Sequence, residues 1–335
     1  MSGSSSVDVE GNREILQWAK DVYGTNQPFG SQAIRVGYLS HYLVVSEGEA
    51  LLVDAGYGQN DSAYRLLDAV GIPPEKTTLF LTHLHIDHIG IAAKLAQEGV
   101  TLKMRRSRNA DDLVDPAALL RLLGTSPAPA QQRALCQFDA AEAERSIGHP
   151  IEKLEPDAEL RVGSRRFRVL EFAGHAKGHG GLYEEETGIV FTGDQIIDQI
   201  VPAVSAWHLD RRDMGRFYES LAVVRSLRPR LMLPAHLRPV FGEEEIDEVI
   251  GHIEQSFDKI ANRVHHMLGA RREWISPTEL ARVFYGYHPG GFDGFSPDDQ
   301  VFRLTKMLAY LELLYDSGKA RRRIDDAGTV RYLVR

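Results

Sequence analysis

Short apolar runs alternate with amphipathic patterns along the first part of the chain. Residues 34–56 hold two runs rich in Val, Leu and Tyr, joined by a short turn, which predicts two β-strands. Residues 62–70 have the apolar spacing of a helix, 77–82 predict a buried strand, and 88–98 predict a further helix. This order is typical of an open α/β sheet, in which ligand sites lie at the C-terminal ends of the strands.

A different pattern interrupts this alternation at residues 105–150. The segment is rich in Ala and Leu, and Pro residues break it at 125–130. It predicts two or three helices inserted into the sheet domain. Further elements are predicted downstream: strands at 151–154, 158–163, 166–172 and 188–194, a loop at 196–210, a helix at 212–227 and a strand at 229–236.

The C-terminal part has a third pattern. Residues 243–269 predict a long amphipathic helix with an apolar stripe from Ile246 to Val264. Two more helices are predicted to begin near 276 and to cover 297–316, and the last residues predict a β-hairpin that turns near Gly328. Helix, helix and hairpin in this order predict a winged-helix-like domain.

These patterns divide the chain into three predicted parts. Residues 1–27 form an N-terminal tail and helix, 28–242 form a sheet domain with the helical insertion at about 105–150, and 243–335 form a helix plus a winged-helix-like domain.

Composition narrows the classes of function. The chain has 335 residues and a net charge of −8, which disfavours a general nucleic-acid or membrane-surface binder because these need a basic footprint. The segment 243–335 has 13 Lys and Arg against 16 Asp and Glu, so nucleic-acid binding by this part is disfavoured as well.

Several features also favour a cytoplasmic protein. Cys136 is the only cysteine, which excludes a disulfide framework within the chain. The first residues lack the pattern of a signal peptide, and no apolar run is long enough to span a bilayer.

Candidate metal ligands follow several predicted strands. The stretch THLHIDH, residues 82–88, directly follows a strand, and neutral imidazoles with a carboxylate are typical Zn²⁺ ligands. In an extended loop His83 and His85 point the same way, whereas Asp87 and His88 project differently, so the group can serve two metals. The complete set of candidates is His83, His85, Asp87, His88, His175, Asp194 and His236.

At this point the chain resembles the metallo-β-lactamase-fold hydrolase superfamily. The motifs THLHIDH, GHAKGH, TGD and PAH carry the resemblance over roughly residues 30–240, and VDAG at 53–56 resembles an early signature of the family. The GDQ sequence and the tail are similar to a glyoxalase II-like bacterial branch. The resemblance implies an αββα four-layer sandwich. It also implies a first metal held by His83, His85 and His175, a second held by Asp87, His88 and His236, a bridging Asp194, and Asp54 as a partner that orients a ligand.

The expected activity is metal-dependent hydrolysis through a metal-bridging hydroxide, with Asp87 and Asp194 as the catalytic carboxylates. Two Zn²⁺ ions are expected, with Mn²⁺ or Fe²⁺ as alternatives, and the substrate is a small ester, thioester or lactone. Other reactions on this fold remain open: a hydrolytic dehalogenase, a phosphodiesterase or nuclease, and a mono-iron oxygenase. The apolar stripe on 243–269 favours packing or a homodimer.

The remaining candidates have weaker signals. His179 lies four residues after His175 and is expected to contact the substrate or a metal ligand rather than a metal. Trp207 and His208, in the loop after Asp194, are candidates for the wall of the substrate pocket. GHAKGH has Ala176 and Lys177 where many family members have Thr and Pro.

Overall fold

The structure is a computed structural model that describes residues 6–7, 15–29, 37–107, 115–136 and 140–335. The chain forms two compact units, and each is discontinuous in sequence. Unit 1 comprises residues 1–110, 143–202 and 220–250, and unit 2 comprises 111–142, 203–219 and 251–335. The predicted domain boundary at residue 242 stays a prediction.

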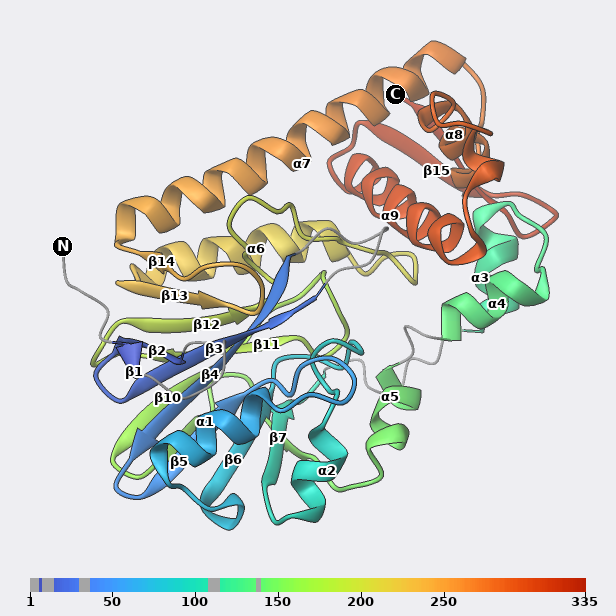
Figure 1. The fold of residues 1–335 in the computed structure, drawn as a ribbon. Helices are drawn as coiled ribbons and strands as arrows, with labels where there is room; N and C mark the ends of the chain where they lie inside the picture. The colour runs from blue at the N-terminus through green and yellow to red at the C-terminus, as the bar shows by residue number, and fades with distance from the viewer. Residues whose placement is uncertain (1–5, 8–14, 30–36, 108–114, 137–139) are drawn as a thin grey trace. The chain divides into compact units, whose positions relative to one another are not determined.

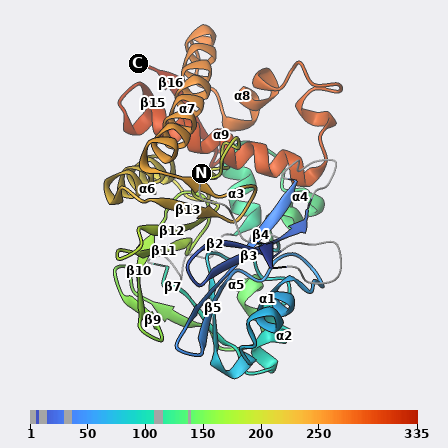
Figure 2. The same ribbon diagram turned by 60° about the vertical axis from the view of Figure 1, so that its left-hand side comes forward.

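Unit 1 contains two sheets (Figures 1 and 2). The strands of the first sheet pair in chain order, antiparallel from β1 to β5 and parallel from β5 to β8. They are β1 (Ser6–Val7), β2 (Ile15–Ala19), β3 (Val22–Pro28), β4 (Tyr38–Ser46), β5 (Glu49–Val53), β6 (Thr77–Leu81), β7 (Thr101–Arg105) and β8 (Glu152–Leu154).

The second sheet has the order β14-β13-β12-β11-β10-β9, with a parallel pair only between β12 and β13. Its strands are β9 (Glu159–Val162), β10 (Arg165–Glu171), β11 (Gly180–Glu184), β12 (Ile189–Gly193), β13 (Leu231–Pro234) and β14 (Val240–Phe241). β11 and β14 were not predicted from the sequence pattern.

A core of buried side chains from both sheets holds unit 1 together. Tyr42, Val44 and Phe80 of the first sheet pack with Phe167 and Phe191 of the second, and all are at most 2% exposed. Burying aromatic side chains of this size contributes a few kcal/mol each, so this layer stabilises the contact between the two sheets. The sheets therefore stack face to face, as the resemblance predicted.

Helices cover the outer faces of unit 1. α1 (Ser62–Val70) packs on β3 and β4, and α2 (Ala92–Gln97) packs on β7. On the second sheet, the last turns of α6 (Asp213–Leu227) lie close enough for the Tyr183 hydroxyl of β11 to donate to the carbonyl of Leu227 at 3.2 Å. The predicted α/β class with metallo-β-lactamase architecture is therefore confirmed.

Unit 2 combines the insertion with the C-terminal region. α3 (Pro116–Leu123) and α4 (Pro129–Cys136) pack with α8 (Pro277–Phe284), η2 (Phe292–Gly294), α9 (Pro297–Asp316) and the hairpin β15 (Ala320–Ile324) and β16 (Val330–Val334). Three helices have residues in both units: α5 (Ala140–Ile147), α6 and α7 (Glu243–Arg271). The three predicted C-terminal helices and the hairpin are confirmed. The described residues of the insertion form three helices, within the predicted two or three, and the winged-helix assignment stays a prediction.

Two expectations from the sequence pattern are wrong. The segment predicted as an N-terminal helix forms β2 and β3, because β3 pairs along its whole length with β4 and buries Val22 in the core. The helix predicted at 88–98 begins only at Ala92. Its expected first turn bonds elsewhere: the carbonyl of His88 accepts from the N–H of Ala55, and the N–H of Gly90 donates to the carbonyl of Gly56.

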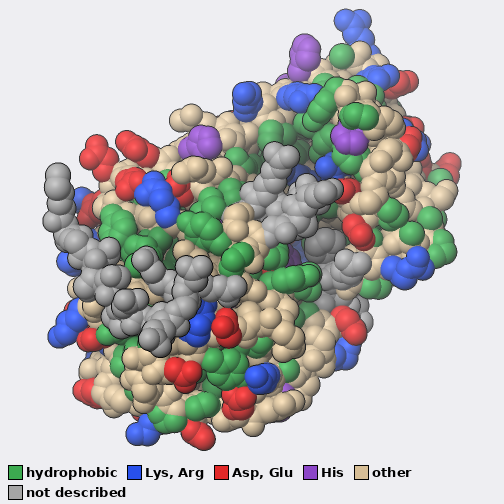
Figure 3. Space-filling model, viewed as in Figure 1, with side chains coloured by type: hydrophobic (Ala, Val, Ile, Leu, Met, Phe, Trp, Pro, Cys, Tyr) green, Lys and Arg blue, Asp and Glu red, His purple; other side chains and the backbone are tan. Residues whose placement is uncertain are grey.

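Acidic and basic side chains are interspersed on the face of the molecule in Figure 3. No helix among the described residues combines the length and the apolar character needed to cross a membrane.

Candidate metal centre

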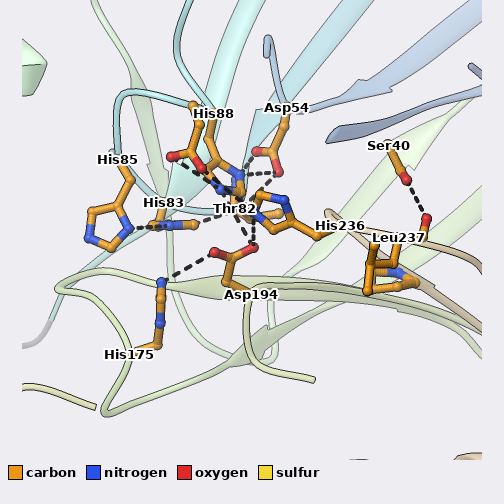
Figure 4. A network of polar contacts seen from close by, with 12 residues as sticks. Ser40, Asp54, Thr82, His83, His85, His88, His175, Asp194, His236 and Leu237 are labelled. Atoms are coloured by element: carbon orange, nitrogen blue, oxygen red, sulfur yellow. Dashed lines mark hydrogen bonds and ion pairs between the residues drawn. The ribbon is translucent and has the colours of Figure 1, made fainter. Parts of the chain in front are cut away.

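The predicted ligands converge in unit 1 on the loops that follow strands (Figure 4). The loop after β6 contributes three histidines and an aspartate, and the segments after β10, β12 and β13 contribute one residue each. The residues brought together are His83, His85, Asp87, His88, His175, Asp194 and His236. They form three overlapping groups whose potential ligand atoms lie within 4.8 Å of one another within each group.

The carboxylate of Asp194 lies between two sets of imidazoles. Its Oδ2 atom is 3.5 Å from Nε2 of His175. Its Oδ1 atom is 3.2 Å from Nε2 of His236 and 3.5 Å from Nε2 of His88. The two oxygens therefore face different halves of the cluster.

Asp87 completes the half that contains His88 and His236. Its Oδ1 atom is 3.7 Å from Nε2 of His88, and its Oδ2 atom is 3.6 Å from Nε2 of His236. The other half contains His83 and His85, whose Nε2 and Nδ1 atoms are 2.8 Å apart.

The separations around Asp194 and Asp87 fit a shared metal ion, whereas the 2.8 Å between His83 and His85 is a hydrogen-bond distance. Two ligand atoms bound about 2.1 Å from one tetrahedral zinc ion lie roughly 3.4 Å apart. The distances of 3.2–3.7 Å around Asp194 and Asp87 bracket this value, and all but the 3.2 Å between His236 and Asp194 are longer than an ordinary hydrogen bond. In addition, Nε2 of His88 and Oδ1 of Asp194 are buried and make no hydrogen bond within the described part of the chain. Buried polar atoms of this kind require an explanation, and a metal ion supplies one.

Asp54 orients His88 through Nδ1, the ring nitrogen that faces away from the cluster. Asp54 is 3% exposed, and its Oδ2 atom is 2.8 Å from Nδ1 of His88. The backbone N–H and the hydroxyl of Thr82 donate to the same carboxylate at 2.8 and 2.9 Å. If Nδ1 of His88 donates to Asp54, the proton is held on that side of the ring and Nε2 faces the cluster as a free lone pair.

Burial and charge act in opposite directions on these groups. Burial lowers the pKa of both His83 and His85 well below the ordinary value, and neutral imidazole is the form that binds metals. Burial also opposes the charged form of His88, but the carboxylates of Asp194, Asp54 and Asp87 outweigh it and raise the pKa of His88 well above its ordinary value. Despite burial, His236 and His88 hold the pKa of Asp194 well below its ordinary value.

His179 contacts the backbone next to this carboxylate. The N–H of Asp194 donates to Nε2 of His179 at 3.2 Å, so Nε2 is unprotonated and burial lowers the pKa of the ring. Gly193 has φ +53°, and a Cβ atom there would come within 2.7 Å of Nε2 of His179 and 2.9 Å of Thr82. Glycine is therefore required for the sharp turn that directs Asp194 into the cluster.

The structure also places residues that the sequence pattern missed. The Ser40 hydroxyl donates to the carbonyl of Leu237 at 2.7 Å, next to His236, and Leu237 has φ +63°. His41 is 1% exposed, burial lowers its pKa to about 3, and neither ring nitrogen makes a hydrogen bond to a described residue. The extended pattern of β4 predicts neither the hydrogen bond of Ser40 nor the burial of His41. Trp207 and His208 belong to unit 2, and their predicted place in a pocket wall stays a prediction.

Comparison with known proteins places the chain in a family. Residues 35–236 match the model of the Metallo-beta-lactamase superfamily, and the chain belongs to this superfamily. It is 26% identical over 252 residues to the Probable metallo-hydrolase YqjP of Bacillus subtilis. The aligned residues cover 68% of this chain and 74% of that protein.

Two further similarities support the same placement. Hydroxyacylglutathione hydrolase GloC of Haemophilus influenzae is 28% identical over 187 residues, or 56% of this chain and 75% of that protein. A Beta-lactamase domain protein from Burkholderia ambifaria superposes with a TM-score of 0.73 over 96% of this chain and 94% of that chain. At 21% identity, this last similarity shows the fold alone.

Proposed function

We propose that the protein is a two-metal hydrolase that cleaves a small ester, thioester or lactone. Zinc is the metal that suits the mixed imidazole and carboxylate ligands, and manganese and iron are the alternatives. In this proposal His83, His85 and His175 hold one ion, Asp87, His88 and His236 hold the other, and Asp194 bridges them.

One observation carries the proposal: the two oxygens of Asp194 face different imidazoles at 3.2–3.5 Å. A carboxylate can bind one ion through each oxygen, whereas a histidine ring nitrogen binds a single ion. The complete Asp87, His88 and His236 group also favours two ions over the single iron of an oxygenase.

When bound, such ions lower the pKa of water and polarise a carbonyl group. The residues of this chain have complementary roles. Asp54 and Thr82 keep His88 in the tautomer that presents Nε2. Asp87 lies beside His88 and His236, where its carboxylate can accept the proton that water loses, whereas Asp194, with one oxygen for each ion, acts by holding the ions in place.

Two arguments favour an acyl substrate: bound metal ions polarise carbonyl groups, and one relative is named for an acyl hydrolysis. The Haemophilus relative is named a hydroxyacylglutathione hydrolase, which supports acyl compounds as substrates. We place hydrolytic dehalogenation and phosphodiester cleavage behind acyl hydrolysis, and both remain outcomes of the test below.

The test combines metal analysis with a substrate panel. The purified protein is loaded separately with zinc, manganese and iron, its metal content is measured by mass spectrometry, and turnover is followed on a thioester, a lactone, a phosphodiester and an aryl halide. We expect two equivalents of metal per chain, hydrolysis of an acyl substrate, and ¹⁸O from labelled water in the product. A single iron with oxygen uptake, or a trapped acyl-enzyme, would contradict the proposal. His252→Ala, which changes an exposed histidine outside the cluster, serves as a control and should match wild type in metal content and turnover.

A further inference from the structure

Two large apolar side chains on the loops of the metal centre face solvent. Tyr57 is 45% exposed and lies three residues after Asp54. Ile86 is 59% exposed and lies between His85 and Asp87. Single exposed apolar side chains are common on protein surfaces, but these two lie on the loops that carry the proposed metal ligands, where a side chain can contact a bound substrate.

The aromatic ring of Phe29 connects Tyr57 with the cluster. The centroids of the Phe29 and Tyr57 rings are 5.3 Å apart in an edge-to-face arrangement at 64°. The Phe29 centroid is also 6.0 Å from that of His236. The three rings thus form a row that runs from a proposed metal ligand to a solvent-exposed tyrosine.

The exposed tyrosine is held in place by its backbone. The side-chain amide of Gln27 donates to the carbonyl of Tyr57 at 2.8 Å and accepts from its N–H at 3.1 Å. The Asn60 side chain donates to the carbonyl of Ala55 in the same loop at 3.1 Å. Both amides therefore fix the loop before any ligand binds, which reduces the entropy lost when a ligand contacts Tyr57.

We propose that this row of Tyr57, Phe29 and His236 binds an aromatic ring in the acyl part of the substrate. The inference rests on the proposed function, because the ring must lie beside the carbonyl group to be cleaved. A flat ring suits the site because Phe29 and Tyr57 already adopt the edge-to-face geometry that aromatic groups prefer. Such a contact contributes roughly 0.5–1.5 kcal/mol beyond the buried area, so we expect a preference of about two- to tenfold over a non-aromatic ring of similar size.

The experiment measures binding and turnover separately. Calorimetry on the zinc-loaded protein compares phenylacetate with cyclohexylacetate, which has a similar size but no aromatic ring. Turnover compares the two corresponding thioesters of N-acetylcysteamine. Wild type is expected to favour the aromatic compound about two- to tenfold in both assays. Tyr57→Ala should abolish the preference, and Tyr57→Phe should retain it.

The outcomes separate this inference from the proposed function. Equal affinity of wild type for both carboxylates, or a preference that survives in Tyr57→Ala, would overturn the aromatic subsite. Binding of phenylacetate with the expected preference, but no hydrolysis of either thioester, would support the subsite and count against the proposed reaction. Tyr287→Ala is the matched control, because Tyr287 is 73% exposed in unit 2, and its preference should equal that of wild type.

Discussion

Asp194 presents its two oxygens to imidazoles in different halves of the cluster, and this property can be tested by removing only the charge. Asp194→Asn keeps the size of the side chain but leaves two proposed cations with less compensation, and it replaces one acceptor oxygen by an N–H donor. We expect the loss of at least one metal equivalent and a fall in turnover of a hundredfold or more, with the circular dichroism spectrum unchanged.

Asp157→Asn is the matched control, since it removes the same charge from an exposed carboxylate of unit 1. An Asp194→Asn variant that binds two metals and turns over at the normal rate would rule out the bridging role.

Ser40 contacts the backbone next to the proposed ligand His236. Its hydroxyl holds the carbonyl of Leu237, whose left-handed backbone costs a non-glycine residue roughly 1 kcal/mol or more. The hydrogen bond therefore stabilises the loop that presents His236.

Ser40→Ala should weaken metal binding about fivefold in the half that contains His236, because a lost hydrogen bond of this kind corresponds to about 1 kcal/mol. Metal titration against a chelator would show one weakened and one unchanged equivalent. Ser46→Ala, at the far end of the same strand, should leave both equivalents as in wild type. Two unchanged equivalents in Ser40→Ala would show that Leu237 needs no anchor.

At the scale of elements, α3 depends on residues from the C-terminal region. The Thr278 hydroxyl donates to the carbonyl of Leu123 at 2.8 Å, and the Thr329 hydroxyl donates to that of Arg121 at 3.1 Å. Gly124 ends the helix at φ +82°, and a Cβ atom there would come within 2.8 Å of Ser276. The last carbonyls of α3 are thus satisfied by side chains more than 150 residues away in the sequence.

Thr278→Val should leave the carbonyl of Leu123 buried without its partner, at a cost of about 1–3 kcal/mol. Hydrogen exchange at the amides of α3 should accelerate by at least tenfold, whereas exchange in α1, which lies in unit 1, should not change. Thr278→Ser keeps the hydroxyl and should restore slow exchange. Unchanged protection of α3 in Thr278→Val would refute this dependence.

Local pattern predicted most elements and the ligand cluster, but not the contacts that complete them. THLHIDH could be interpreted because ligand types, a preceding strand and later strand ends occur in order. The bounds of α9, the final hairpin and the turn before β5 follow from caps, glycines and periodicity. β2 and β3 were missed because their stability comes from pairing with β4, and the role of Ser40 depends on a partner 197 residues away. Such long-range contacts leave no local signal.

At the scale of the whole molecule, the chain folds into two units whose segments interleave. Unit 2 contains α3 and α4 from the insertion as well as the C-terminal helices, and α4 packs on α9, where Gln131 donates to Gln300 at 2.7 Å. The insertion therefore shares its core with the C-terminal region, and we expect the two to fold and to unfold together.

This interleaving makes a strong prediction for truncation after Gly242. The truncated chain keeps α3 and α4 but loses α9 and the hairpin, so Leu119, Leu120 and Leu123, each at most 4% exposed in the full chain, lose partners. Exposing three buried leucines removes roughly 2 kcal/mol of stabilisation each.

Light scattering should show aggregation or a larger oligomer, and limited proteolysis should cut first within 111–142. A second truncated variant, with 111–142 replaced by a Gly-Ser linker, should aggregate less because it lacks those leucines. If the first truncation remained soluble in the oligomeric state of the full chain and was fully active, the C-terminal region would be dispensable for the insertion and the shared core would not matter for stability.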